Sequence, residues 1–222
     1  HPFGGLRLSH GHKISDALGE PMKYVFSFGG KRHEKEIDRA QALLAGVPGG
    51  IQRALMRSIN RALSSGRTTV GREVAKRYYI DPRDVKKTVT FNRATRTRLD
   101  GQMISTGERN ELRDYLHKPS DESTTGANRK PVRVFIKKGG AESSLGRAFK
   151  FNNHIFARNG RKITASRGWH KGKVVEQIEK PTGPSVPQMV GNQSVVEVVG
   201  EKMVAAFAKQ LEKEISAVLK DK

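Results

Sequence analysis

The C-terminal part of the chain carries an apolar stripe that restricts the folds open to it. Hydrophobic side chains recur there at steps of three or four residues, which is the periodicity of one face of an α-helix. The stripe consists of Val196, Val199, Met203, Val204, Phe207, Leu211, Ile215 and Val218. Ser194 and Glu197 predict a capping box at its start. We therefore expect an amphipathic helix of about 25 residues that packs on a sheet, on other helices or on a neighbouring subunit.

A second stripe predicts helices in the N-terminal half. Residues 31–45 form a first predicted helix, and the Gly- and Pro-rich residues 46–50 end it. Helical spacing then resumes with Ile51, Leu55, Ile59, Leu63, Val70, Val74 and Tyr78. Gly66 and Gly71 interrupt this longer helix, so we expect a kink or break near residues 64–67.

Asp81 and Pro82 predict the start of a short helix over residues 82–87, because Asp can cap exposed backbone N–H groups and Pro suits the first turn. Strand-like patterns follow, and we expect residues 119–130, rich in small polar residues, to be a mobile loop. The predicted strands are residues 22–28, 88–94, 97–106, 131–138, 149–158 and 172–179. Residues 88–94 and 97–106 are expected to pair, and Asn159-Gly160 is the predicted turn between the last two strands.

Together these patterns predict an α+β fold with long N-terminal helices, a small and mostly antiparallel sheet or barrel, and a C-terminal amphipathic helix. The chain of 222 residues is long enough for at least one true core. The predicted divisions are an extended arm over residues 1–31, a helix-plus-sheet core over residues 32–190, and a C-terminal helix over residues 191–222. The arm is expected to lie on another element or to fray as a terminus.

The net charge of the chain indicates which kinds of binding partner it favours. The chain has 42 Lys and Arg against 22 Asp and Glu, a formal charge of +20. The excess lies in the middle of the chain, +9 in residues 47–110 and +9 in residues 111–190, whereas residues 191–222 are neutral. Such a field favours nucleic acid, an acidic protein surface or a membrane face.

Arg53, Arg57 and Arg61 follow one another at steps of four residues and form a basic stripe beside the apolar one. Lys137 and Lys138 add a second basic pair at the end of a predicted strand. Each set is a candidate contact for DNA or an acidic partner, or a solvated surface. No zinc-finger spacing or aromatic RNA-binding pattern is present, so DNA contact would be sequence-independent and made to phosphates.

Few residues suggest chemistry. The chain has no cysteine, which excludes disulfides, Cys-ligated zinc and thiol catalysis. It has no apolar run long enough to cross a membrane and no secretory leader in its first 30 residues, so we expect a soluble, intracellular protein. His10 and His12 lack an adjacent carboxylate, whereas Asn152, Asn153 and His154 faintly resemble nuclease motifs. We predict no enzyme activity, cofactor or metal, and keep a His154-based nuclease as an alternative.

Several segments resemble the minor tail protein Z family of long-tailed bacteriophages, also called tail completion proteins. The most specific is Gly183-Pro184-Ser185-Val186-Pro187-Gln188-Met189, which resembles a family signature ahead of the C-terminal helix. The other resembling segments are residues 49–62, 72–78, 83–87, 146–149 and 154–158. The resemblance covers roughly residues 47–219 and leaves the arm and residues 162–171 unmatched.

The resemblance implies structural work at the head-proximal end of a phage tail. It implies a homo-hexameric ring that makes the tail competent for head joining, contacts tail terminator or tail tube proteins and head–tail connector proteins, and lets genomic DNA pass. The implied location is the virion neck, with the host cytoplasm as the site of assembly.

The signature segment has two interpretations of its own. Pro184 and Pro187 restrict the backbone and favour a stiff, extended connector without internal hydrogen bonds. The alternative is an inter-subunit contact made by Pro184, Ser185, Val186, Pro187 and Gln188. A basic, sequence-independent DNA-binding protein remains a further alternative for the whole chain.

Overall fold

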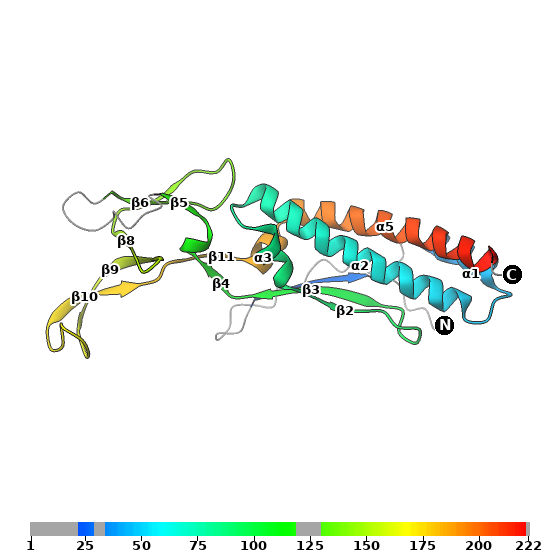
Figure 1. Cartoon of the computed structure of the whole chain (residues 1–222), viewed down its shortest axis with the longest axis horizontal. Helices are drawn as coiled ribbons and strands as arrows, with labels where there is room; N and C mark the ends of the chain where they lie inside the picture. Colours follow the sequence, from blue (N-terminus) through cyan, green and yellow to red (C-terminus); the bar gives the residue numbers. More distant parts are fainter. Residues whose placement is uncertain (1–21, 29–33, 119–129, 221–222) are drawn as a thin grey trace. The chain divides into compact units, whose positions relative to one another are not determined.

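The computed structural model describes residues 22–28, 34–118 and 130–220. It confirms an α+β fold with long helices and small antiparallel sheets (Figure 1). The chain divides into two compact units, the first formed by His1–Ala75, Asp81–Glu108 and Ser185–Lys222, the second by Lys76–Ile80 and Arg109–Pro184. Within the described ranges, no helix has both the length and the apolar content needed to cross a membrane. The predicted loop and most of the predicted arm lie outside the described residues.

The first unit combines the long helices with one sheet. Its elements are β1 (Met22–Phe28), α1 (Glu34–Leu44), α2 (Gly50–Arg77), α3 (Pro82–Lys87), β2 (Val89–Asn92), β3 (Gly101–Gly107), α4 (Val186–Val190) and α5 (Gln193–Lys220). The predicted helices over residues 31–45 and 82–87 are confirmed as α1 and α3. Asp81 caps α3 as expected, because its carboxylate accepts a hydrogen bond from the N–H of Arg83 at 2.6 Å.

The two longest helices run antiparallel and supply most of the core. Gly50 of α2 lies against Val218 of α5, and Gly66 lies against Met203. Residue numbers therefore increase along α2 in the direction in which they decrease along α5. Fully buried side chains line both helices at helical spacing: Leu55, Ile59, Leu63, Val70 and Val74 on α2, and Val199, Met203, Phe207 and Leu211 on α5. Most of the two predicted stripes is therefore confirmed as the two faces of one core, whereas Ile51, Val196, Val204 and Val218 are only half-buried.

Of the kink or break predicted near residues 64–67, the break is wrong, because α2 continues from Gly50 to Arg77. Both interrupting glycines have a packing reason. A Cβ on Gly66 would lie 2.7 Å from the Met203 sulfur, and one on Gly71 would lie 2.9 Å from Cε of Lys86. These residues allow close approach of neighbouring elements and do not end the helix.

The sheet of the first unit has the strand order β1-β3-β2, with both pairings antiparallel. The predicted pairing of the two strands after α3 is confirmed, although β3 begins only at Gly101. The predicted strand over residues 22–28 is β1, and it places Tyr24 and Phe26 in the core. This part of the predicted arm thus belongs to the sheet of the first unit.

The start of α5 differs from the prediction. Asn192, not Ser194, accepts the hydrogen bond at the helix start, from the backbone N–H of Ser194 at 3.1 Å. Glu197 instead accepts from the side chain of Gln193 at 2.8 Å. The helix begins at Gln193, two residues earlier than its Ser-x-x-Glu pattern indicates, because Asn192 caps it.

The second unit consists of short strands and one turn of 3₁₀ helix. Its elements are β4 (Arg109–Glu111), η2 (Leu112–Asp114), β5 (Leu116–Lys118), β6 (Val132–Phe135), β7 (Ser143–Leu145), β8 (Ala148–Phe151), β9 (His154–Thr164), β10 (Val174–Glu179) and β11 (Thr182–Ser185). They form three sheets, with the orders β5-β6-β7, β10-β9-β8 and β11-β4. Val132, Val134, Ala148 and Ile155 are buried, as alternation in the sequence predicts for β6.

The predicted turn at Asn159-Gly160 is wrong. These residues lie inside β9, where a register shift against β10 accommodates Gly160 with φ +84°. The β8–β9 turn falls at Asn152 and Asn153, which adopt φ of 47° and 60°. Asn tolerates this left-handed region, so the Asn-Asn pair divides the predicted strand 149–158 into β8 and β9, whereas the turn between β9 and β10 lies beyond Thr164.

Candidate functional site

The segment that carries the family resemblance begins against a tyrosine. A Cβ on Gly183 would lie 2.7 Å from the ring of Tyr115, so only glycine fits there. The Tyr115 hydroxyl donates a hydrogen bond to the Pro184 carbonyl at 2.6 Å and accepts one from the Asn110 side chain at 3.2 Å. Burial raises the pKa of Tyr115 to about 12. The start of the segment is thus fixed on one side by a neutral, hydrogen-bonded phenol.

The rest of the segment is not the extended connector that its prolines predict. It is extended only to Ser185, the end of β11, and becomes helix α4 at Val186. Ser185 and Gln188 form a capping box: the N–H of Ser185 donates to the Gln188 side chain at 2.9 Å, and the N–H of Gln188 donates to Ser185 Oγ at 3.3 Å. Pro187 sits in the first turn, where a helix needs no N–H, so it starts the helix.

The burial of residues 183–190 bears on whether this segment is a connector within the chain or a contact between subunits. Ser185, Val186, Pro187, Met189 and Val190 are buried within the chain, and α4 packs on β1 and β3. The Gln188 side chain is exposed. This arrangement supports an architectural role for the buried residues, and a contact with another subunit through this segment stays a prediction.

The three predicted arginines lie on the exposed side of α2 in the first unit, but they are not equivalent. Arg57 Nη1 forms an ion pair with Glu214 Oε2 on α5 at 2.9 Å. Gln210 donates to the other oxygen of Glu214 at 2.8 Å. The guanidinium groups of Arg53 and Arg61 make no ion pair or hydrogen bond with the described residues. Arg57 therefore links two helices, whereas the other two arginines remain open to an anionic partner.

Lys137 and Lys138 lie in the second unit, just after β6, and both are exposed. Their backbone is fixed by a β-bridge between Tyr78 and Lys137 and by a hydrogen bond from the N–H of Lys138 to the Arg77 carbonyl at 2.8 Å. The Lys138 ammonium lies 5.6 Å from the centre of the Tyr79 ring, within cation–π range. The five predicted basic residues thus divide between the two units.

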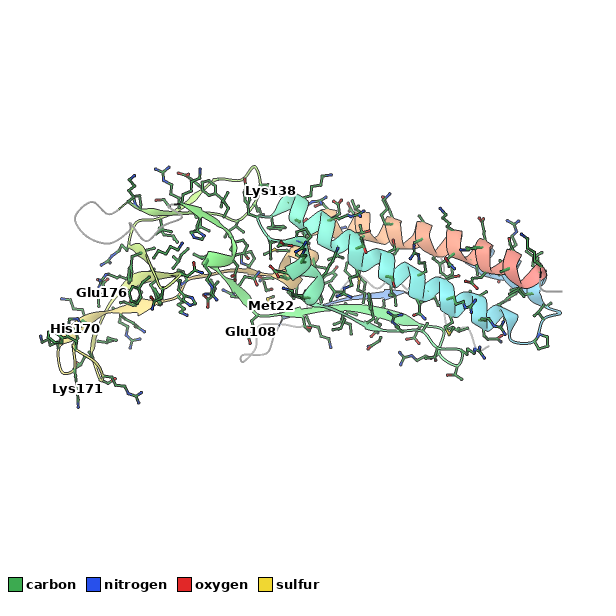
Figure 2. The ribbon with its side chains drawn as sticks, in the orientation of Figure 1. Met22, Glu108, Lys138, His170, Lys171 and Glu176 are labelled. Carbon is green, nitrogen blue, oxygen red and sulfur yellow. The ribbon has the colours of Figure 1, made fainter. Side chains whose placement is uncertain are left out.

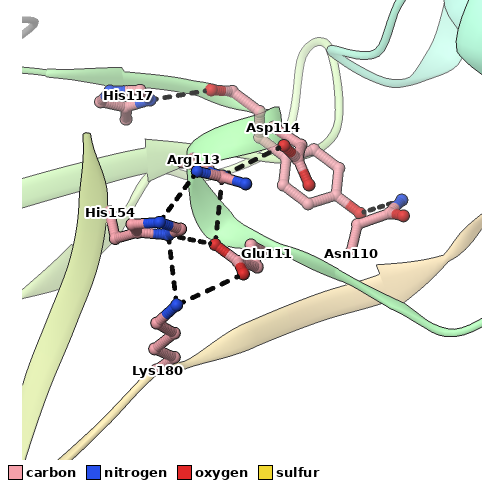
Figure 3. A network of polar contacts seen from close by, with 8 residues as sticks. Asn110, Glu111, Arg113, Asp114, His117, His154 and Lys180 are labelled. Atoms are coloured by element: carbon pink, nitrogen blue, oxygen red, sulfur yellow. Dashed lines mark hydrogen bonds and ion pairs between the residues drawn. The ribbon is translucent and has the colours of Figure 1, made fainter. Parts of the chain in front are cut away.

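His154, the centre of the nuclease alternative, belongs to a network of charged side chains (Figure 3). Its Nδ1 lies 2.6 Å from Glu111 Oε2, and its Nε2 lies 3.1 Å from Arg113 Nη1. Arg113 Nε also pairs with Glu111 at 3.1 Å, and Lys180 lies 3.7 Å from the second Glu111 oxygen.

The partners of His154 indicate which of its ring nitrogens donates a hydrogen bond and which accepts one. A carboxylate can only accept a hydrogen bond and a guanidinium can only donate one, so Nδ1–H donates to Glu111 and Nε2 accepts from Arg113. The hydrogen bond from His154 and the neighbouring Arg113 and Lys180 lower the pKa of Glu111. Both ring nitrogens are occupied, and Nε2 faces a cation. This geometry suits an ionic brace between β4, β9 and Lys180 better than it suits a metal ligand.

No group of three His, Cys, Asp or Glu side chains placed to hold a metal ion occurs among the residues that the structure describes. His10 and His12 lie outside those residues. Comparison with protein-family models, with curated proteins and with solved structures finds no match to this chain. The relationship to tail completion proteins therefore stays a prediction from the sequence.

One exposed feature was missed by sequence reasoning. The β9–β10 hairpin ends in Trp169, whose side chain is 90% exposed, between Gly168 and Gly172. The signal was present in the sequence, since the only tryptophan of the chain stands in a run of basic residues flanked by glycines. The predicted turn at Asn159-Gly160 concealed it by placing the end of the hairpin too early.

Proposed function

We propose that this chain is a structural tail completion protein of a long-tailed bacteriophage. In this role it forms a homo-oligomeric ring, hexameric by analogy with the family, at the head-proximal end of the tail. The ring makes the tail competent for head joining and allows genomic DNA to pass. Its neighbours are a tail terminator or tail tube protein and the head–tail connector proteins.

The observation that supports this proposal most is the part played by the signature segment. Gly183 is required by the Tyr115 ring, Ser185 and Gln188 cap each other, and Met189 is fully buried. The residues that carry the family resemblance are thus residues whose identities the fold needs. A resemblance at such positions reflects a shared local structure better than one on an exposed surface would.

Charge supports the second part of the proposal, passage of DNA. Arg53, Arg61, Lys137 and Lys138 are exposed, and none forms an ion pair in the described part of the chain. Such residues can neutralise phosphates with no sequence preference, and their binding then weakens steeply with salt. The same residues would also suit acidic surfaces of neighbouring rings.

Electron cryomicroscopy of assembled virions tests the proposal directly. We expect six copies of the chain in the neck, with Arg53 and Arg61 facing the lumen. Six copies with these residues facing neighbouring proteins would retain the assembly role and assign the charge to partner binding. Absence of the chain from the particle would contradict the proposal.

A pair of variants separates DNA contact from stability. Arg53→Gln combined with Arg61→Gln should lower phage yield and salt-dependent DNA retention while leaving the folded protomer intact. Arg57→Gln is the control for a structural effect, because it removes the partner of Glu214. Unchanged titre and DNA retention in the double variant would refute the DNA role of this stripe.

The alternatives make different predictions for the purified protein. A freely acting DNA-binding protein predicts tight, salt-sensitive binding of duplex DNA by isolated protomers and no incorporation into particles. A nuclease predicts metal-dependent cleavage that is lost in His154→Ala. Of these two alternatives the nuclease is the less supported, since both ring nitrogens of His154 already have hydrogen-bond partners.

A further inference from the structure

The β9–β10 hairpin ends in a basic tip, which we define as residues 161–173. This tip contains five Lys and Arg residues and no Asp or Glu. They are Arg161, Lys162, Arg167, Lys171 and Lys173. In Figure 2 the labelled His170 and Lys171 lie at this end of the hairpin, away from the body of the sheet. Trp169, 90% exposed, lies in the same turn.

The backbone of the tip is ordered by its own hydrogen bonds. The N–H of Ala165 donates to the Lys173 carbonyl at 3.0 Å, and the N–H of Gly172 donates back to the Ala165 carbonyl at 2.8 Å. A tight turn follows inside this closure, with the N–H of Lys171 bonded to the Gly168 carbonyl at 3.0 Å. Gly168 and Gly172 supply φ values of +77° and +80°. Trp169 is thus presented on a defined turn.

The acidic residues of the hairpin do not neutralise this tip. Glu176 forms an ion pair with Arg147 at 2.5 Å, and Glu179 accepts a hydrogen bond from Asn159 at 3.4 Å. Both glutamates lie on β10 beyond the tip. None of the five tip cations forms an ion pair with the residues that the structure describes. A polyanion is the partner whose charge complements such a surface.

We propose that the basic tip binds single-stranded nucleic acid without sequence preference, with its cations on phosphates and Trp169 stacked on an unpaired base. Stacking of bases on aromatic rings is the common device of such sites, and it tolerates every base. Unpaired bases are the preferred target because a base within a duplex has no free face. The inference goes beyond the proposed function, because passage of genomic DNA does not itself require contact with unpaired bases, and it rests on that proposal only for its biological setting.

A lipid bilayer fits the hairpin less well. The exposed apolar residues here, besides Trp169, are Ile163, which lies within the tip, and Val174, which follows it; they are 38% and 68% exposed. Ile163 is opposite Val175 and Val174 is opposite Thr164, so the two lie on opposite faces of the ribbon. Trp169 therefore has no continuous apolar face to accompany it into a membrane, as interfacial segments require.

The single tryptophan makes the test direct, because all tryptophan fluorescence of the full chain comes from Trp169. We expect a short oligothymidine to quench this fluorescence at low salt, and quenching to weaken as salt rises. Because Trp169→Ala has no tryptophan fluorescence, its affinity is measured with a labelled oligonucleotide. This substitution should weaken binding by between about 5-fold and about 150-fold. Lys171→Gln with Lys173→Gln should reduce the salt slope by about 1.4, at roughly 0.7 per phosphate contact.

Phe151→Ala is the matched control, since Phe151 is an aromatic residue of the same sheet, 54% exposed and distant in sequence from the tip. It should leave oligothymidine affinity unchanged. Binding that is equal in wild type and Trp169→Ala would overturn the inference, as would equal affinity for a blunt duplex. A blue shift with anionic vesicles but no response to oligothymidine would also overturn it and assign the tip to a membrane surface.

The two proposals fail separately. A chain found in the neck whose tip does not bind oligothymidine would retain the tail completion role and refute the tip site. Oligothymidine binding by a chain absent from virions would retain the tip site and refute the tail completion role. Arg53→Gln combined with Arg61→Gln should leave Trp169 quenching unchanged, because these residues belong to the other unit.

Discussion

Gly66 lies in the middle of α2, where alanine is ordinarily the better helix former by about 1 kcal/mol. Here the added methyl group would lie 2.7 Å from the Met203 sulfur and 2.9 Å from Met203 Cγ on α5. Overpacking of a close-packed core costs about 1–3 kcal/mol. The gain in helix propensity offsets part of that cost. We therefore predict that Gly66→Ala lowers the free energy of unfolding by up to about 2 kcal/mol.

The sign should reverse when Met203 is shortened. Met203→Ala alone removes a fully buried side chain and should cost about 2–5 kcal/mol. In that background the methyl group of Gly66→Ala meets no sulfur and fills part of the cavity. It should then stabilise the chain by about 1 kcal/mol or more. The coupling energy between the two positions is expected to be about 1–3 kcal/mol.

Urea unfolding followed by circular dichroism at a helical wavelength measures these free energies. Most helical residues lie in the first unit, so this signal reports the unit that carries both substitutions. Gly200→Ala is the matched control: it is a glycine inside α5, and a Cβ there would meet no described atom within 4 Å. It should stabilise by about 1 kcal/mol through helix propensity alone. Equal effects of Gly66→Ala and Gly200→Ala, or an effect of Gly66→Ala that is the same in both backgrounds, would refute the packing argument.

Three further predictions concern the second unit. Gly183→Ala should lower the free energy of unfolding of this unit by about 1–3 kcal/mol, because the added methyl group meets the Tyr115 ring, which two hydrogen bonds hold in place. Thermal unfolding followed by near-ultraviolet circular dichroism measures this decrease. The Tyr115 pKa of about 12 exceeds the value of about 10 for an unfolded tyrosine, so its stabilising contribution is complete below pH ~10 and disappears as pH rises through the folded pKa. Tyr115→Phe should abolish that alkaline dependence, and absorbance titration locates the ionisation. Glu111 should titrate below its ordinary pKa by NMR, with stability falling as pH drops through that lowered pKa, and His154→Gln should raise the Glu111 pKa.

Periodicity was the reliable guide to the helices. The stripes in α2 and α5 predicted most of the large apolar side chains that are buried there, because a 28-residue helix repeats its burial signal many times. The break predicted at Gly66 does not occur, and the periodicity of the sequence could not show why. Glycine lowers helix propensity, but it also lets a second helix approach, and only the position of Met203 decides between the two effects.

The short strands were harder to place, because local turn signals compete. Asn159-Gly160 is the stronger turn motif, yet it lies within β9 at a register shift, whereas Asn152 and Asn153, inside the predicted strand 149–158, form the β8–β9 turn. The pairing of β9 with β10 decided this outcome, and such pairing is not local information. The same limitation applies to the candidate site. Helical spacing grouped Arg57 with Arg53 and Arg61, but its partner Glu214 is 157 residues away in sequence.

The cationic side chains of the chain thus have two different roles, which the net charge does not distinguish. Arg57, Arg113 and Arg147 each hold a glutamate of the same unit, and their charge is already used to join neighbouring elements. The basic tip of the β9–β10 hairpin has five cations and no acidic residue, so its field is directed outward. Replacing a paired arginine removes the guanidinium partner of a carboxylate and affects stability first. Replacing a tip cation removes only outward charge, and a change in binding then reports contact with the anion itself.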